Sequence, residues 1–155
     1  MKLFLDTANL EWITKLNQMG IVDGVTTNPS LIAKEVGEFE EIIVKICKEV
    51  KGDVSAEVVG VTHDAMVAEA GTLSSLARNV VVKIPMTPEG LKATKTVSSK
   101  GIRVNVTLIF SANQGLLASK AGASFVSPFI GRLDDIGHRG MEVVEDLVRI
   151  RDNYG

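Results

Sequence analysis

The 155-residue sequence predicts an α/β fold in which parallel strands and helices alternate and curl toward a barrel of the TIM type. Short β-branched runs alternate with longer segments of helical period, which is the pattern of successive strand–helix units. Polar residues also recur on one face of the strands, near their carboxyl ends. A doubly wound sheet buries both faces under helices, whereas the interior of a TIM-type barrel leads to a site at this end of the strands.

Six strand–helix units are expected along the chain, and no linker or low-complexity segment divides it. The strands are expected near residues 2–6, 21–26, 53–58, 80–84, 102–107 and 124–128. The helices are expected near residues 10–19, 30–50 in two pieces, 62–78, 88–100, 112–121 and 139–153. Asn9 can cap the first helix, and Thr87 can cap a helix that begins with a proline. Glycines stand where three helices give way to the next strand, at Gly20, Gly101 and Gly122.

Alternation along the strands separates an aliphatic face from a polar one, because successive side chains point to opposite sides. The aliphatic face can pack against helices and includes Leu3, Leu5, Val54, Ala56, Val58, Val80, Val82, Ile84, Ile102, Val104, Val106 and Leu108. The opposite face carries Lys2, Phe4, Asp6, Ser55, Glu57, Val81, Lys83, Arg103, Asn105 and Thr107. The polar groups of this second face are therefore expected to converge at the mouth of the barrel.

Composition narrows the class of protein. With 45% hydrophobic residues and a net charge of −2, we expect a soluble globular domain without a basic surface for nucleic acid. The chain lacks the features of a signal peptide and any run of 18 apolar residues, which predicts a cytoplasmic protein with no membrane partner. Cys47 falls on an apolar helical stripe, where a buried thiol is expected. His63 and His138 fit no metal-ligand spacing, so no metal is expected.

Lys83 is the first candidate for chemistry, because it lies near the end of the apolar run from Val80 to Pro85. An ammonium taken out of water is costly or gives up its proton. A lysine partly deprotonated by burial is a nucleophile for carbonyl carbons, as in Schiff-base enzymes. Alternatively, its stem lies on apolar surface while its head reaches water.

Two carboxylates are candidates for proton transfer. Asp6 follows an apolar strand, where it could move protons for a neighbouring amine or cap the next helix. Glu57 is buried by pattern, which suits a general acid or base. A structural ion pair with Lys83 is the alternative for Glu57.

Polar side chains at other strand ends could hold a substrate. Asn105 and Thr107 aim an amide and a hydroxyl in the same direction, which suits substrate hydroxyls or a water. Asn28 follows the second strand, where it could equally be a turn residue. Arg132 is expected in a glycine-containing loop after the sixth strand, where it could grip a phosphate. A surface ion pair with Asp134 or Asp135 is the alternative.

Five segments, in order through the whole chain, resemble the small transaldolases of the transaldolase and fructose-6-phosphate aldolase group. They are Asp6-Thr7-Ala8-Asn9, residues 24–32 (GVTTNPSLI), Val82-Lys83-Ile84-Pro85, Asn105-Val106-Thr107-Leu108 with Phe110-Ser111, and residues 127–132 (SPFIGR). The group consists of (β/α)8 barrels that act through a Schiff base and need no metal or other cofactor. The resemblance therefore implies this fold and this class I chemistry.

The resemblance also implies catalytic roles. Lys83 would form the imine with the substrate ketone, and Asp6 would move protons at the substrate hydroxyl during carbon–carbon cleavage. Glu57 would work with Thr107, through a water, on imine formation and hydrolysis.

Binding roles are implied for a second set of residues. Asn28 and Asn105 would hold the dihydroxyacetone hydroxyls, Ser127 would line the site, and Arg132 would bind the sugar phosphate. Phe129 would complete the site, and it is one of two positions that distinguish the branches of the group.

The aldolase branch has glutamine and tyrosine at the positions matching Glu57 and Phe129, whereas glutamate and phenylalanine stand here as in transaldolases. We therefore expect transfer of a dihydroxyacetone unit from sedoheptulose 7-phosphate to glyceraldehyde 3-phosphate, giving erythrose 4-phosphate and fructose 6-phosphate in the non-oxidative pentose phosphate pathway. One alternative is a fructose-6-phosphate aldolase. The other is a catalytically silent sugar-phosphate-binding homologue, which fructose 6-phosphate would stabilise against heat without turnover.

The six strand–helix units expected here are fewer than the eight of the family. Barrels of this type usually need roughly 200 residues or more for eight units. Here we expect one barrel domain over residues 1–155 that lacks the last two units. The expectation is a fragment of a longer protein; the alternatives are a homologue that closes its barrel through another copy and an open sheet with relic motifs. Strands one and six would then be sheet edges that favour association, and a homo-oligomer is expected.

Overall fold

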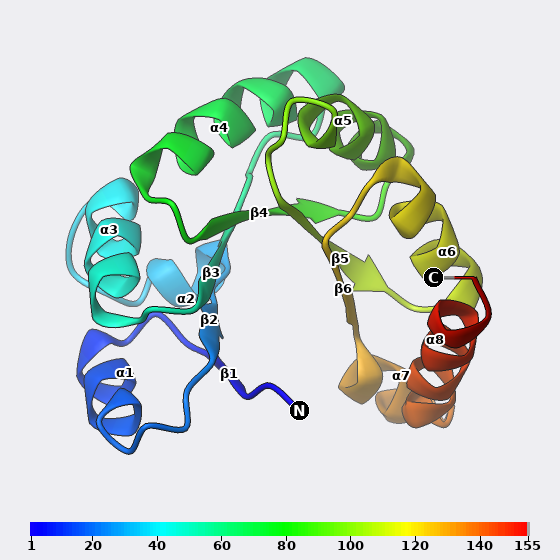
Figure 1. The fold of residues 1–155 in the computed structure, drawn as a ribbon, viewed down its shortest axis with the longest axis horizontal. Helices are drawn as coiled ribbons and strands as arrows, with labels where there is room; N and C mark the ends of the chain where they lie inside the picture. Colours follow the sequence, from blue (N-terminus) through cyan, green and yellow to red (C-terminus); the bar gives the residue numbers. More distant parts are fainter. Residues whose placement is uncertain (155) are drawn as a thin grey trace.

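The computed structural model describes residues 1–154, and in it parallel strands alternate with helices (Figure 1). The strands are β1 (Phe4–Asp6), β2 (Gly24–Thr26), β3 (Asp53–Glu57), β4 (Val80–Pro85), β5 (Val104–Ile109) and β6 (Phe125–Pro128). The helices are α1 (Leu10–Asn17), α2 (Pro29–Ile32), α3 (Phe39–Glu49), α4 (His63–Leu76), α5 (Pro88–Ser98), α6 (Ala112–Ala121), α7 (Ile130–Asp135) and α8 (Gly140–Tyr154). All six expected strands are confirmed.

The strands form one parallel sheet in the order β1-β2-β3-β4-β5-β6. The sheet curls strongly, and its outer side is covered by α1, α3, α4, α5, α6 and α8 (Figure 1). Its first and last strands approach each other across the interior, where the rings of Phe4 and Phe125 meet edge to face with centroids 6.2 Å apart. The chain is therefore a partial (β/α)8 barrel, and within residues 1–154 β1 and β6 are its two edges, as expected.

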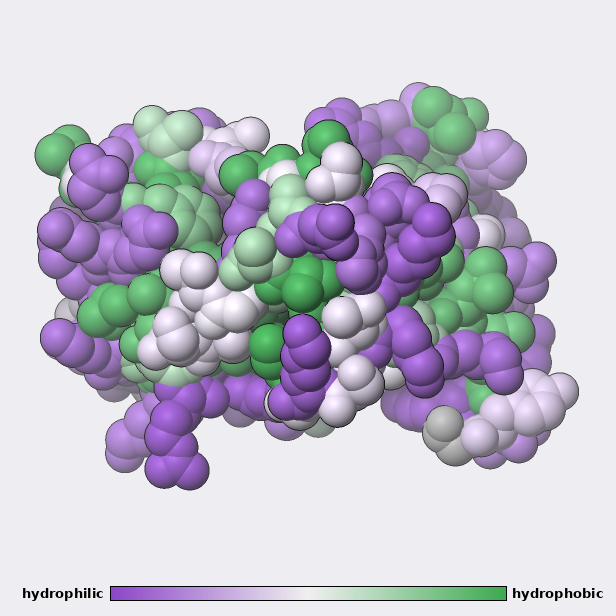
Figure 2. Space-filling view, turned by 90° about the horizontal axis from the view of Figure 1, so that it is seen from above, coloured by the Kyte–Doolittle hydropathy of each residue, from purple (hydrophilic) through white to green (hydrophobic). Residues whose placement is uncertain are grey.

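The aliphatic face of the strands packs against the helices and forms the core. Ile84 of β4 is fully buried, as are Ile13 of α1, Ile43 and Ile46 of α3, and Met66 of α4. Burying each of these side chains contributes about 1.5–3 kcal/mol. On the outer side, polar residues are interspersed with apolar ones over the helical layer (Figure 2).

Two expected helix caps are confirmed. The Asn9 side chain accepts a hydrogen bond from the Trp12 N–H at 2.9 Å, and the Thr87 hydroxyl accepts one from the Gly90 N–H at 2.9 Å. Gly122 ends α6 with a φ of 100°, a conformation that favours glycine because it has no Cβ. These local signals fix where α1, α5 and α6 begin or end.

The cysteine prediction is also confirmed. Cys47 is buried on α3, and burial raises the pKa of its thiol to about 11, so the thiol stays protonated at neutral pH. None of the helices within residues 1–154 combines the length and apolarity required to cross a bilayer.

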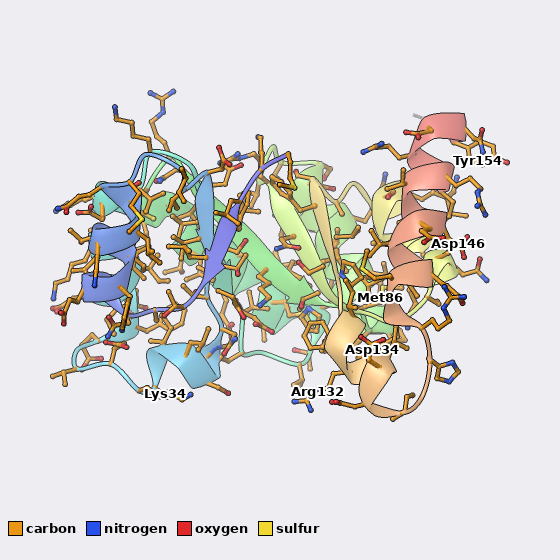
Figure 3. All side chains as sticks on the ribbon, turned by 90° about the horizontal axis from the view of Figure 1, so that it is seen from below. Lys34, Met86, Arg132, Asp134, Asp146 and Tyr154 are labelled. Atoms are coloured by element: carbon orange, nitrogen blue, oxygen red, sulfur yellow. The ribbon has the colours of Figure 1, made fainter. Side chains whose placement is uncertain are left out.

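The segment after β6 differs from the expectation, because Arg132 lies in helix α7 and not in a loop. The helix has six residues and contains Gly131, and the side chain of its N-cap residue, Phe129, makes no capping hydrogen bond. The usual start signal is therefore missing from the sequence. Figure 3 places Arg132 and Lys34 at the same end of the molecule, the end at which the strands finish.

Strand β5 carries one residue more than β6 between two of their pairs. Val106 pairs with Val126, and Ile109 pairs with Pro128. Leu108 lies at this bulge with a φ of 62°, a conformation that costs a leucine about 1–2 kcal/mol. The predicted alternation is therefore wrong at this point: Ile109 joins the core and Leu108 is half-buried. The bulge directly follows Thr107.

Candidate active site

A cavity of about 490 Å³ opens at the carboxyl ends of the strands. Its lining includes most of the site residues predicted from the sequence: Asp6, Asn28, Lys83, Thr107, Ser127, Phe129 and Arg132. The two remaining predicted residues lie behind this lining, where Glu57 contacts Lys83 and Asn105 contacts Ser127. The structure therefore brings all nine candidates together at one end of the sheet.

The amine of Lys83 lies inside the barrel. Its side chain is only 8% exposed, which excludes the alternative in which the ammonium reaches bulk water. The Nζ atom lies 3.3 Å from Oε2 of Glu57 and donates a hydrogen bond to the Thr27 carbonyl at 3.1 Å. Glu57 and Lys83 are partners in the β3–β4 register, and Thr27 directly follows β2, so three neighbouring strands hold the amine in place.

The ion pair considered for Glu57 is present, and it suits a chemical role as well. The Glu57 side chain is 17% exposed, and its carboxylate is near enough to the Lys83 amine to exchange a proton directly or through one water. The pair thus sets an amine beside a carboxylate, two groups that can serve as a nucleophile and a base.

Thr107 offers a hydroxyl without a protein partner. The residue is 1% exposed, and its Oγ1 makes no hydrogen bond within residues 1–154. An unsatisfied buried hydroxyl costs about 1–3 kcal/mol, so its position favours a partner from outside the protein, a water or a substrate atom.

A chain of hydrogen bonds crosses the interior behind the cavity. The Ser127 hydroxyl donates to Oδ1 of Asn105 at 2.9 Å, and Nδ2 of Asn105 donates to the Ser55 hydroxyl at 3.2 Å. Asn105 is 4% exposed. These contacts from β6 and β3 fix the orientation of its amide.

The first two strands supply a carboxylate and an amide. Asp6 Oδ1 accepts a hydrogen bond from the Thr26 hydroxyl at 2.9 Å, and Asn9 caps the following helix, so the capping role considered for Asp6 is wrong. Asn28 caps α2 by accepting from the Leu31 N–H at 3.0 Å, which leaves its NH2 group as the donor toward the cavity.

Thr26 is a cavity residue that the sequence reasoning missed. It pairs with Asp6 in the β1–β2 register, so its hydroxyl reaches the carboxylate. Alternation along the strand could have identified it, because Thr26 lies two residues before Asn28 and therefore on the same side. It also ends a strand that lies beside β1.

The phosphate candidate lies at the rim. Arg132 Nη1 is 3.6 Å from Oδ2 of Asp135, and the two side chains are 74% and 67% exposed. The surface ion pair considered for Arg132 is therefore present. An exposed pair of this kind contributes about 0–1 kcal/mol to stability, so breaking it to bind an anion costs little. Nearby, the Phe129 ring packs edge to face on Phe110, with centroids 5.6 Å apart.

A family model and several curated relatives all point to the same family. Residues 3–155 match the family model described as transaldolase/fructose-6-phosphate aldolase. The whole chain is 61% identical to a probable transaldolase of Kosmotoga olearia and 58% identical to probable transaldolase 2 of Listeria monocytogenes, covering 71% of each relative. It is 59% identical to a probable transaldolase of Methanococcus maripaludis and covers 72% of it.

Solved structures of lower identity share the fold. Pyruvate carboxylase of Rhizobium etli superposes with a TM-score of 0.57 at 16% identity, over 83% of this chain and 15% of that one. The carboxyl transferase domain of the same enzyme gives 0.56 at 12% identity, over 96% of this chain and 33% of that one. At these identities the likeness concerns architecture alone.

Proposed function

Because this chain belongs to the transaldolase/fructose-6-phosphate aldolase family, we propose that it is a transaldolase that acts through a Schiff base on Lys83. The proposed reaction moves a dihydroxyacetone unit from sedoheptulose 7-phosphate to glyceraldehyde 3-phosphate and yields erythrose 4-phosphate and fructose 6-phosphate, in the non-oxidative pentose phosphate pathway. The observation that carries the proposal is the buried Lys83 amine, held 3.3 Å from Glu57 beside the cavity.

Imine formation is the first step. The neutral Lys83 nitrogen attacks the ketose carbonyl carbon, a proton passes from nitrogen to oxygen, and the resulting hydroxyl leaves as water after accepting a second proton. Glu57 is placed to take a proton from the amine and return one to the departing oxygen. The free hydroxyl of Thr107 is placed to hold the water that carries these protons.

Carbon–carbon cleavage follows. Asp6 takes the proton of the donor hydroxyl next to the breaking bond, the aldehyde product leaves, and the electron pair of the broken bond becomes part of an enamine on Lys83. Addition of the acceptor aldehyde reverses these steps, and water then releases the new ketose. Asn28, Asn105 and Ser127 would hold the hydroxyls of the dihydroxyacetone unit meanwhile.

Replacing Thr107 by valine tests the proposed water site. Valine has almost the same shape and carries no hydroxyl, so the proposed bond to water is lost, and we expect the free energy of unfolding to change by no more than about 1 kcal/mol. Transfer should fall on the order of 10²-fold. Denaturant unfolding and a coupled transfer assay measure the two effects. A folded Thr107→Val variant with full activity would contradict the role.

Replacing Arg132 by alanine tests the phosphate site. We expect KM for a phosphorylated donor to rise by about 10- to 100-fold, because hydrogen bonds to charged groups contribute about 1.5–3 kcal/mol. The KM for an unphosphorylated ketose should stay unchanged. Arg139→Ala is the matched control, since Arg139 is 83% exposed and pairs with Glu142. An equal rise in KM for both donors would assign Arg132 a role other than phosphate binding.

The aldolase alternative is decided by product analysis. The resemblance makes Glu57 and Phe129 the two positions at which the branches of the family differ, and both residues favour transfer. The proposed function predicts fructose 6-phosphate from sedoheptulose 7-phosphate only when glyceraldehyde 3-phosphate is present. Release of free dihydroxyacetone as the main product would support the aldolase.

We propose that residues 1–154 belong to one barrel domain. The homo-oligomeric state and the cytoplasmic location expected from the sequence stay predictions, and size-exclusion chromatography of the purified chain tests the first of them.

A further inference from the structure

The backbone of the loop that follows β3 is hydrogen-bonded to a carboxylate from a helix on the outer side of the sheet. Oε2 of Glu69, on α4, accepts hydrogen bonds from the backbone N–H groups of Val59 at 2.7 Å and Gly60 at 3.1 Å. A carboxylate that receives two consecutive N–H groups makes strong, charge-assisted bonds. Glu69 thereby fixes the backbone two and three residues beyond Glu57.

The same stretch is also held from the β4 side. The Val58 N–H donates to the Lys83 carbonyl at 3.1 Å, and the Glu57 carboxylate reaches the Lys83 amine. The backbone from Glu57 to Gly60 therefore lies between the strand that carries the amine and the helix that carries Glu69. A movement of this loop that shifts the end of β3 would change the distance between Glu57 and Lys83.

Gly60 supplies an independent observation. A Cβ at this position would lie 2.7 Å from the Ala65 Cβ and 2.8 Å from Oε1 of Glu69. The loop backbone thus approaches the carboxylate and α4 more closely than any larger residue allows. The two hydrogen bonds to Glu69 therefore depend on the absence of a side chain at residue 60.

We infer that Glu69 is a positioning residue that holds Glu57 at its working distance from Lys83. The inference rests on the proposed function, in which Glu57 exchanges protons with the amine during imine formation. Glu69 itself would touch neither the substrate nor the reacting atoms. The expected signature is a slower imine step at an unchanged affinity for the donor.

The test compares four variants with the wild-type protein, using borohydride trapping of the imine at saturating fructose 6-phosphate. Glu69→Met keeps the side-chain volume and removes the acceptor, and we expect the rate of imine formation to fall about tenfold, with KM within twofold of wild type. Glu69→Gln keeps an oxygen acceptor and should recover most of that loss. Gly60→Ala should reproduce the fall, because its Cβ displaces the loop.

Glu40→Met is the matched control. Glu40 lines the same cavity between α3 and α4 as Glu57 and Glu69, so this variant makes the same change of charge nearby, and we expect wild-type rates. Circular dichroism checks that each variant is folded. A purely structural role of Glu69 would lower Tm and leave the rate per folded molecule unchanged. A positioning role would lower kcat per folded molecule and leave KM unchanged, so measuring both constants separates the two roles.

The outcomes separate this inference from the proposed function. A wild-type protein that forms no adduct would overturn both. A wild-type adduct together with unchanged imine rates in folded Glu69→Met and Gly60→Ala would overturn the positioning role alone. A fall in Glu40→Met equal to that in Glu69→Met would also overturn it, because charge and not loop contact would then be responsible.

Discussion

Lys83→Met is expected to abolish imine formation and to reduce transfer on the order of 10⁴-fold or more, because methionine keeps the aliphatic volume and removes the only atom proposed to bond to the substrate. The fold should survive. Glu57 loses its cation, but it is 17% exposed and can be hydrated, so we expect a loss of no more than about 3 kcal/mol in the free energy of unfolding. Denaturant unfolding and intact mass after reduction measure both effects.

Two further variants make the Lys83 result interpretable. Lys34→Met removes an exposed lysine from the same end of the molecule and should leave transfer unchanged (Figure 3). The double variant Lys83→Met with Glu57→Gln should regain part of the lost stability, because neither half of the ion pair remains. Normal turnover in folded Lys83→Met would refute the mechanism.

Asp6→Asn is expected to separate the two chemical steps. Asparagine keeps the shape, and its carbonyl oxygen can still accept the Thr26 hydrogen bond, but it cannot take a proton. Transfer should fall by about 10²- to 10⁴-fold, the usual contribution of a positioned general base. The imine itself should still form, because Glu57 is the residue proposed to transfer its protons.

Trapping experiments identify the blocked step. After borohydride reduction, the wild-type protein should carry the dihydroxyacetone unit, whereas Asp6→Asn should carry the whole uncleaved donor. Asp146→Asn makes the same substitution on α8, away from the mouth of the barrel, and should behave like the wild-type protein (Figure 3). Loss of the adduct in Asp6→Asn would move Asp6 from the cleavage step to imine formation.

The alternation of side chains along the strands is enough to predict that the site residues meet at one end of the sheet. Alternation alone predicts that Lys83 and Glu57 share a face of the sheet, and the parallel register sets them side by side. The aliphatic residues of the other face, such as Val82 and Ile84, are fully buried as expected. Period-2 patterns survive because one face of each strand has to meet the helices.

Two local features could not be read from the sequence. The bulge at Leu108 places a leucine at positive φ, which intrinsic preference opposes, so the register of β5 on β6 decides it. Helix α7 lacks a capping side chain and is too short to show a period, so the sequence predicts a loop at Arg132 where the structure has a helix. In both cases tertiary packing overrides the local signal.

Other contacts of the site depend on pairs of residues that lie far apart in the chain. The bond from Ser127 to Asn105, and the bonds from the Val59 and Gly60 N–H groups to Glu69, follow only when register and helix placement are known. Sequence patterns indicate which side chains face inward, and they do not indicate which of them touch.

The proposed mechanism requires a covalent bond between the amine of Lys83 and a ketose phosphate. This bond can be trapped by reducing the folded wild-type protein with borohydride in the presence of fructose 6-phosphate, followed by peptide mapping. We expect a dihydroxyacetone adduct on the peptide that contains Lys83, and no adduct without borohydride. No adduct in folded protein, or an adduct on another lysine that persists in Lys83→Met, would refute the mechanism.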